Sequence, residues 1–327
     1  MSMAVTMKDI AERAQVSRPV VCAVLGGKST CRVSEEKRRR ILELVRELGF
    51  QPNLQAQRLR SGKTKTVGIL FASFRDRIIG DVMMELYRRL LQSGYTSIIA
   101  IWEKASEIER AYRNVVRNKV DGIITCDYHP EWIGEKIPVV VYGKQFPETD
   151  SITIDYAAAF SEALEYLVSL GHRRFGYIGC EGERLDACSA VMKQYGFSGS
   201  YCVYNGMGYP ENGIRGVRHL LERENPPSAI FCHNDSVALA AMAEAQRMGC
   251  AVGSDLSIIG LDNTLESSFS YPALTTIDTF IAEKAGMMVD LLLARLEDPG
   301  KKTVSMVLKS KLIIRDSCGP VRSGEKK

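Results

Sequence analysis

The chain has 327 residues, of which 45% are hydrophobic and 25% charged, so it is large enough for two or three folded domains. This composition excludes a disordered chain, and no stretch approaches the roughly 18 apolar residues of a membrane span. The net charge of +4 is unevenly distributed, since residues 1–65 hold 14 Lys and Arg against 6 Asp and Glu, and the remainder holds 29 against 33. A basic end on an acidic body fits a polyanion-binding head; a solvated basic face without a partner is the alternative.

The sequence predicts neither a metal site nor a disulfide framework. Its nine cysteines form no CxxC pair, and its four histidines form no HExxH motif. Cysteines in apolar runs, such as Cys232, fit the core of a protein kept in a reducing compartment. The N-terminus has no apolar core of the signal-peptide type. We therefore expect a cytoplasmic protein without a metal or cofactor.

Two short helices are predicted at the basic end. Thr6 and Asp9 have the spacing of a capping box, which opens the first helix. Ser17 can cap the second helix, in which Pro19 is tolerated because it lies in the first turn. Two short helices joined by about three residues form a helix-turn-helix pattern.

A third helix is predicted from Ser34, and Gly49 ends it. Its basic residues 37–40 remain partly available for phosphates. Asn53 is a possible cap for one more short helix over residues 54–60, which is too short to be stable alone in water. We expect this last helix to fold on DNA with the help of a partner subunit.

From residue 66 onward, short apolar strands alternate with amphipathic helices. The predicted strands are 67–71, 97–101, 122–125 and 139–142, then 175–180, 201–204, 229–232 and 257–260, with helical stretches near 77–93 and 104–118. This alternation indicates parallel sheets covered on both faces, in which ligands bind beyond the carboxyl ends of the strands. Two groups of strands indicate two lobes with a cleft.

Several motifs of the basic region have a specific spacing. They are Met7-Lys8-Asp9-Ile10-Ala11, Gln15-Val16-Ser17, Arg32-Val33-Ser34, Leu48-Gly49-Phe50-Gln51-Pro52-Asn53 and Thr66-Val67-Gly68. Together they resemble the head and hinge of the lactose/galactose repressor family. Four later motifs resemble that family's effector-binding body, which is similar to periplasmic sugar-binding proteins: Gly171-His172-Arg173-Arg174, Asn234-Asp235, Gly260-Leu261-Asp262 and Pro272-Ala273-Leu274-Thr275-Thr276-Ile277.

The resemblance implies a fold and a division of the chain. A small all-α helix-turn-helix head (1–50) is joined by a hinge helix and linker (51–65) to an α/β body with parallel sheets (66–327). The body has the two lobes of periplasmic binding proteins, lobe 1 from residues 66–155 and 280–309, and lobe 2 from residues 156–279 and 310–318. The chain is then expected to cross between the lobes near residues 155, 279 and 310.

The resemblance also implies which residues contact DNA. The start of the second helix enters the major groove, so Ser17, Arg18 and Pro19 lie at the operator, and Arg18 suits a bidentate contact with guanine. In the hinge, Leu59 matches a leucine that is pushed between base steps, and Ala56 packs on the same face. Thr6 and Asn53 complete the expected DNA-binding set.

The second helix departs from the family pattern after Pro19. A Thr-Val-Ser-Arg run usually follows, and its arginine contacts DNA, but this chain has Val20-Val21-Cys22-Ala23. Ala23 cannot make that contact, and Pro19 replaces a polar reader, so base readout is expected to rest on fewer polar side chains.

Four polar residues after strands of the second group match the family's effector site: Arg184, Asn234, Asp235 and Asp262. Carboxylates accept hydrogen bonds from sugar hydroxyls and a guanidinium donates them, so the set suits a sugar-like effector, a polyol or a base with several polar edges. For an aspartate after a strand, a helix cap or a salt bridge is the alternative.

Three further residues have plain structural alternatives. Ile79 and Tyr209 match apolar or aromatic platform positions for the effector, and either could be ordinary core. His172 invites a catalytic interpretation, but we expect it in a surface turn between a helix and a strand.

The function predicted from the sequence is that of a sequence-specific DNA-binding transcription regulator, most simply a repressor, and not an enzyme. It is expected to bind a pseudo-palindromic operator as a homodimer, without a leucine-heptad tetramerising tail, and to respond to a sugar-like small molecule between its lobes. One alternative is a sugar-binding transport protein, and another is a sugar-processing enzyme using Asp235 and Asp262 as an acid/base pair. The basic head and the missing export signal argue against the transport protein. The enzyme would leave the DNA-binding head unexplained, and nothing in the sequence supplies the environment that such an acid/base pair needs. No membrane partner is expected.

Overall fold

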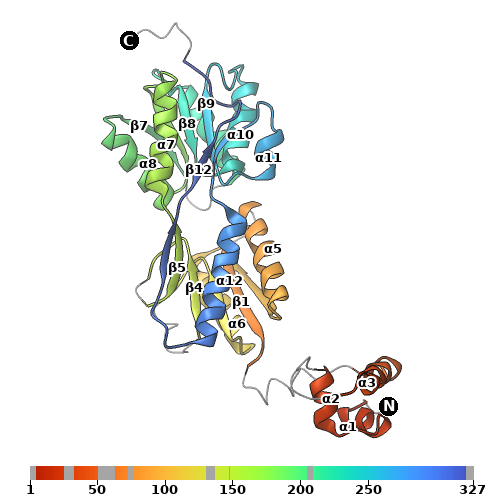
Figure 1. The fold of residues 1–327 in the computed structure, drawn as a ribbon. Helices are drawn as coiled ribbons and strands as arrows, with labels where there is room; N and C mark the ends of the chain where they lie inside the picture. Colours follow the sequence, from red (N-terminus) through yellow and green to blue (C-terminus); the bar gives the residue numbers. More distant parts are fainter. Residues whose placement is uncertain are drawn as a thin grey trace. The chain divides into compact units, whose positions relative to one another are not determined.

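The computed structural model describes residues 5–25, 33–50, 63–72, 77–129, 137–146, 148–204 and 209–321. The chain forms two compact units, Met1–Thr64 and Lys65–Lys327, which we call the head and the body. Figure 1 traces the helices and strands of each unit.

Three helices are described in the head: α1 (Met7–Arg13), α2 (Arg18–Leu25) and α3 (Glu35–Glu47). The predicted capping box of α1 is confirmed, because the Thr6 hydroxyl accepts from the Asp9 amide at 3.4 Å and the Asp9 carboxylate accepts from the Thr6 amide at 2.7 Å. The Ser34 hydroxyl caps α3. A small core joins the helices and contains Ile10, Ala11, Val21, Val24, Ile41, Leu44 and Phe50.

The body contains two six-stranded sheets. The first sheet has the order β11-β5-β4-β3-β1-β2 and is parallel throughout. Its strands are β1 (Thr66–Ala72), β2 (Thr96–Trp102), β3 (Gly122–Thr125), β4 (Val139–Tyr142), β5 (Asp150–Ile154) and β11 (Ser305–Leu308). The second sheet has the order β12-β10-β9-β8-β6-β7 and is parallel except for β12, which runs antiparallel to β10. Its strands are β6 (Phe175–Gly179), β7 (Gly199–Val203), β8 (Ala229–Cys232), β9 (Ser257–Leu261), β10 (Thr275–Asp278) and β12 (Lys311–Ile313).

Helices cover both sheets. Those of the first lobe are α5 (Arg77–Gln92), the short 3-10 helix Ala105–Glu107, α6 (Ile108–Arg117) and α12 (Ile281–Glu297). Those of the second lobe are α7 (Tyr156–Ser169), α8 (Glu183–Gln194), α9 (Pro210–Leu221), α10 (Asp235–Arg247) and α11 (Leu265–Phe269). Although α5 and α12 are far apart in the sequence, they pack side by side on the first sheet (Figure 1). Among the helices of the described ranges, none combines the length and apolar character needed to cross a bilayer.

The chain passes between the two sheets three times. It leaves the first sheet after β5, where Asp155 caps α7, and it returns between β10 and α12 at residues 279–280. It crosses again at residues 309–310, between β11 and β12. Each lobe is therefore assembled from segments that are distant in the sequence.

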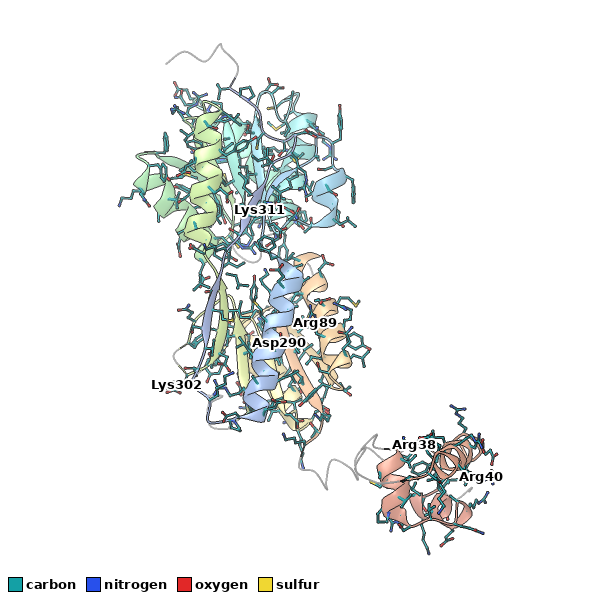
Figure 2. The ribbon with its side chains drawn as sticks, in the orientation of Figure 1. Arg38, Arg40, Arg89, Asp290, Lys302 and Lys311 are labelled. Atoms are coloured by element: carbon teal, nitrogen blue, oxygen red, sulfur yellow. The ribbon has the colours of Figure 1, made fainter. Side chains whose placement is uncertain are left out.

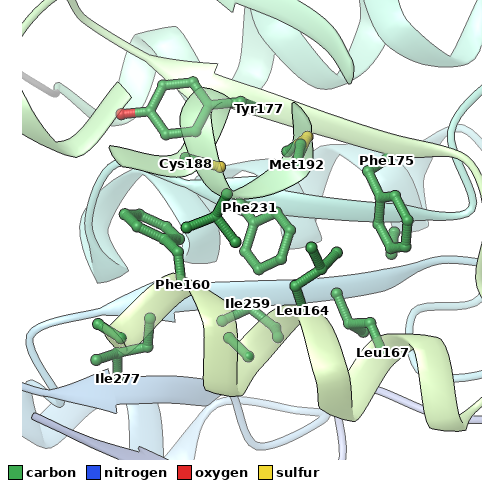
Figure 3. Packing of buried hydrophobic residues seen from close by; sticks show 14 of the residues in the cluster. Phe160, Leu164, Leu167, Phe175, Tyr177, Cys188, Met192, Phe231, Ile259 and Ile277 are labelled. Atoms are coloured by element: carbon green, nitrogen blue, oxygen red, sulfur yellow. The ribbon is translucent and has the colours of Figure 1, made fainter. Parts of the chain in front are cut away.

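A tightly packed core holds the second sheet against α7 and α8 (Figure 3). Phe160 of α7 meets Phe231 of β8 edge-to-face, with ring centroids 5.7 Å apart. Leu164, Phe175 and Ile259 are at most 1% exposed in the same cluster. This packing fixes the strands whose carboxyl ends carry the polar residues described below.

The prediction that His172 lies in a surface turn is wrong. Its chain position does follow α7, but its side chain is only 2% exposed because the C-terminal segment covers it. The ring nitrogens lie 2.9 Å from the hydroxyls of Ser228 and Ser257, and 3.0 Å from the carbonyl of Gly319. His172 therefore ties the C-terminal segment to the second sheet.

Candidate functional site

The start of α2 presents the residues predicted to contact DNA. Ser17, Arg18 and Pro19 are exposed, and Val21 and Val24 turn inward into the head core. Across the described part of the chain, the Arg18 guanidinium has no carboxylate within ion-pair distance, so it is available to a ligand.

A second cationic surface lies at the beginning of α3. Lys37, Arg39 and Arg40 are exposed and Arg38 is half-buried; Figure 2 labels Arg38 and Arg40. Arg40 contacts Glu43 at 3.7 Å, an exposed pair that contributes little to stability. Guanidinium and ammonium groups arranged in this way can contact phosphates regardless of base sequence.

Three of the predicted DNA contacts lie outside the described residues: Asn53, Ala56 and Leu59. Thr6 is described, and its hydroxyl is engaged with Asp9 in the capping box. Thr6, the N-cap residue of α1, thus already has a local structural explanation.

In the body, the structure brings Arg184 and Asp262 together. Arg184 lies in the first turn of α8, and Asp262 directly follows β9 in a left-handed conformation with φ of 110°. The two guanidinium nitrogens Nη1 and Nη2 each lie 3.2 Å from a different carboxylate oxygen, which is a bidentate ion pair. Arg184 also donates to the carbonyl of His233 at 2.7 Å, so it links the carboxyl ends of β8 and β9.

This ion pair belongs to a ring of polar side chains. On one side, Arg184 donates to the Tyr156 hydroxyl at 3.3 Å, and Tyr142 lies beside Tyr156. On the other side, the Thr279 hydroxyl donates to Asp262 at 3.3 Å. Lys284 of α12 closes the ring by donating to Tyr142 at 2.9 Å and to Thr279 at 3.0 Å. We call these six side chains the polar ring: Tyr142, Tyr156, Arg184, Asp262, Thr279 and Lys284.

The polar ring joins the two lobes. Tyr142 ends β4 of the first sheet and Lys284 lies on α12, which packs on that sheet, while Arg184 and Asp262 follow strands of the second. Both tyrosines have a pKa above the usual range because burial disfavours the phenolate, so their hydroxyls stay protonated. Beside the ring, burial and the Arg184 charge lower the pKa of His233 to about 3, which keeps this histidine neutral.

Asn234 and Asp235 have structural partners. The Asn234 side chain caps α10 by accepting from the Val237 amide at 2.9 Å. Asp235 is fully buried and accepts from the Thr276 hydroxyl at 2.5 Å and the Thr264 amide at 2.7 Å. Burial and the nearby Asp262 charge raise the pKa of Asp235 to about 7 against the effect of these bonds.

Ile79 and Tyr209 lie at the two remaining predicted effector positions. Ile79 of α5 packs against the core of the first lobe. Tyr209 is half-buried and directly precedes α9. The hydrogen bonds described above for the polar ring are made by other residues.

Four members of the polar ring were not predicted from the sequence: Tyr142, Tyr156, Thr279 and Lys284. Tyr142 ends a predicted strand, and that position at the carboxyl edge of a parallel sheet could have identified it. Nothing in the sequence around Lys284 indicates that it lies in the site, because a lysine in an amphipathic helix is ordinarily exposed.

Comparison with known proteins gives two matching families. The family of bacterial regulatory proteins of the lacI type matches residues 6–53, and a periplasmic binding protein-like domain matches residues 164–318. The HTH-type transcriptional repressor PurR of Klebsiella pneumoniae (strain 342) is 30% identical over 330 residues, which cover 95% of this chain and 96% of that protein. The chain belongs to the lacI family of bacterial regulatory proteins.

A second relative and a solved structure are similar to the chain over nearly its whole length. The repressor PurR of Salmonella newport (strain SL254) is 30% identical over 340 residues, covering 97% of this chain and 98% of the relative. The Lac repressor dimer bound to operator and the anti-inducer ONPF matches with a TM-score of 0.83 and 23% identity over 96% of this chain and 99% of that one. The predicted fold, a helix-turn-helix head on a two-lobed α/β body, is confirmed. This lacI-family chain is a DNA-binding transcription regulator with an effector-binding body, and the transport-protein and enzyme alternatives are set aside.

Proposed function

We propose that this lacI-family chain represses transcription by binding a pseudo-palindromic operator as a homodimer, and that a small polar effector bound between its lobes changes the operator affinity. The observation that carries the proposal is the polar ring, which joins Tyr142 and Lys284 of the first lobe to Arg184 and Asp262 of the second. A ligand that replaces bonds of the ring changes what holds the lobes together.

Base reading is assigned to the exposed start of α2. Arg18 carries the one guanidinium of that helix, and its fork matches the O6 and N7 acceptors of guanine. Ser17 and Pro19 flank it, with Pro19 limited to an apolar contact such as a thymine methyl. The basic start of α3 supplies phosphate contacts, which orient the head without selecting a sequence.

Exposed apolar side chains support the homodimer. On α5, Met84 is 67% exposed and Leu91 57%, with Tyr87 between them at helical spacing. On and beside α11, Leu265, Phe269 and Tyr271 are also largely exposed. Apolar side chains grouped in this way on a soluble protein mark a contact surface. A two-fold partner at these surfaces would present two heads to two half-sites.

The hydroxyl, guanidinium and carboxylate groups of the polar ring suit a sugar-like effector or a related polar metabolite. Such a molecule offers several donors and acceptors, and the ring provides both kinds. An effector that binds one arrangement of the lobes better than the other shifts the population, and the operator affinity changes with it.

Two measurements test the proposal. Selection of bound duplexes from a random library should yield a pseudo-palindromic site, and a thermal-shift screen of sugars, sugar phosphates and purines should yield a stabilising ligand, with about 2.7 kcal/mol expected at 100 times its dissociation constant. Arg184→Ala should fold and still bind that site, but should lose the ligand response. Selection of no specific duplex would refute the regulator's operator role, and an unchanged response in R184A would remove the effector assignment.

A further inference from the structure

Lys284 of the polar ring is a buried cation without an ionic partner. Its side chain is 1% exposed, and its ammonium donates to two neutral oxygens, the hydroxyls of Tyr142 and Thr279. Within the ranges that the structure describes, no carboxylate lies at ion-pair distance, and the third N–H has no acceptor. The face of the Tyr142 ring, with its centroid 4.8 Å from the ammonium, is a weak substitute for an anion.

The nearby carboxylates are already engaged. Asp262 is held in the bidentate pair with Arg184, and Asp278 accepts from the Phe280 amide at 2.7 Å and from Asn263 at 3.0 Å. The polar ring therefore contains two cationic side chains and one carboxylate. An ammonium buried without a counter-ion is unfavourable, and burial indeed lowers the pKa of Lys284 while the Asp262 charge opposes this. A neutral residue could join the two lobes at this place without that cost.

We propose that the effector carries an anionic oxygen group, either a phosphate monoester or a carboxylate, and that Lys284 and Arg184 receive it. This inference rests on the proposed function, because it assumes that the effector binds at the polar ring. The anion would accept the third N–H of Lys284 and supply the missing negative charge. It would bind with its charged end between α12 and the first turn of α8, where the two cations lie.

The same geometry couples anion binding to the arrangement of the two lobes. Tyr142 and Tyr156 are half-buried and come from different lobes, and both hydroxyls belong to the ring that encloses Lys284. An anion that binds both cations contacts one side chain from each lobe, because Lys284 lies on α12 of the first lobe and Arg184 on α8 of the second. Its binding therefore favours the arrangement of the lobes that brings these two cations together.

The test compares three proteins: wild type, Lys284→Gln and Lys302→Gln. K284Q removes the charge but keeps hydrogen-bond donors, and K302Q is the matched control because Lys302 is exposed in the segment that follows the C-terminal end of α12 (Figure 2). Each protein is titrated calorimetrically with matched pairs: D-glucose and D-glucose 6-phosphate, D-glucose and D-glucuronate, D-ribose and D-ribose 5-phosphate. Thermal unfolding is also measured in inorganic phosphate and in chloride at equal ionic strength.

We expect an anionic member to bind wild type and K302Q at least about tenfold more tightly than its neutral counterpart, and K284Q to reduce that ratio to near one. The pair that shows the preference distinguishes phosphate from carboxylate. Neutral members that bind as well as anionic ones, or a preference that survives in K284Q, would overturn the proposal. If no sugar binds, the thermal unfolding measured in inorganic phosphate and in chloride tests the proposal. A rise in melting temperature in phosphate that is larger for wild type than for K284Q supports the anion site. Equal rises in the two proteins contradict it.

These outcomes separate the inference from the proposed function. Binding of a neutral ligand that Arg184→Ala abolishes would keep the effector site at the polar ring and eliminate the anion. Failure of the wild type to select any duplex would refute operator binding and leave the phosphate comparison intact.

Discussion

At the scale of single residues, Arg18 and Arg40 carry the same charge but occupy different surfaces of the head. Arg18 begins α2, and Arg40 lies on the basic first half of α3. We predict that Arg18→Ala weakens binding to the selected operator by about 1–3 kcal/mol and affects random duplex far less. Arg40→Ala should weaken both duplexes similarly and reduce the salt dependence of binding. Fluorescence anisotropy at several salt concentrations measures both effects, and equal losses in R18A on the two duplexes would contradict base reading.

The buried Asp235 side chain leads to a prediction about how the stability of the protein depends on pH. Its pKa of about 7 in the folded protein lies above the 3.8 of the free side chain, so the folded state binds a proton more tightly than the unfolded state. Its contribution to stability is therefore complete below about pH 4 and is lost as the pH rises through 7. Relative to Asp235→Asn, the wild type should lose about 1–3 kcal/mol of unfolding free energy between pH 5 and 7.5. Urea unfolding at both pH values measures this; parallel changes in the two proteins would show that Asp235 titrates normally.

At the scale of elements, the capping box of α1 explains why a helix of seven residues begins where it does. Thr6→Ala removes the hydroxyl that accepts the Asp9 amide and should destabilise the head by about 1 kcal/mol, while Thr6→Ser should retain most of the stability. The head unfolding transition, followed by circular dichroism, measures the difference. If T6A kept full stability but lost DNA affinity, Thr6 would act on DNA and the cap would be incidental.

The elements that the sequence predicted correctly are those with long apolar runs. Strands β1, β3, β6 and β8 are buried along almost their entire length, so the pattern of apolar residues defines them. Strand β5 was not predicted, because its sequence Asp-Ser-Ile-Thr-Ile mixes polar and apolar residues. Asp150 is nonetheless buried there, since Arg295 of α12 pairs with it at 2.9 Å. Local sequence contains no information about a partner 145 residues away.

The candidate effector site was predictable only in part for the same reason. Arg184 and Asp262 follow strands, and the carboxyl ends of parallel strands meet at one edge. Lys284 and Thr279 reach that edge through the crossing between β10 and α12, which places a helix of the first lobe against the second. His172 is a second case in which local sequence is not sufficient for prediction. The local pattern places it at the surface, but the C-terminal segment packs over it and buries it.

At the scale of the whole molecule, the proposed homodimer depends on the exposed apolar side chains of α5. We predict that Met84→Glu shifts the protein to a monomer, because it places a carboxylate within the apolar surface of α5. Val307→Glu is the matched control, since Val307 is 56% exposed on the edge strand β11 and alternates with Met306 and Leu308, which face the core beneath α5. Sedimentation velocity measures the masses. A dimer that survives in M84E would exclude α5 from the interface.

The three crossings between the sheets have a consequence for synthesis of the protein. The edge strand β11 completes the first sheet and β12 the second, and both follow all the other strands of the body in the chain. Neither sheet can therefore be completed on the ribosome until residues 305–313 have emerged, although the head can fold after its first fifty residues. A prematurely terminated chain would retain the DNA-binding head but not a complete lobe. Its head would occupy DNA without the part of the molecule that responds to the effector.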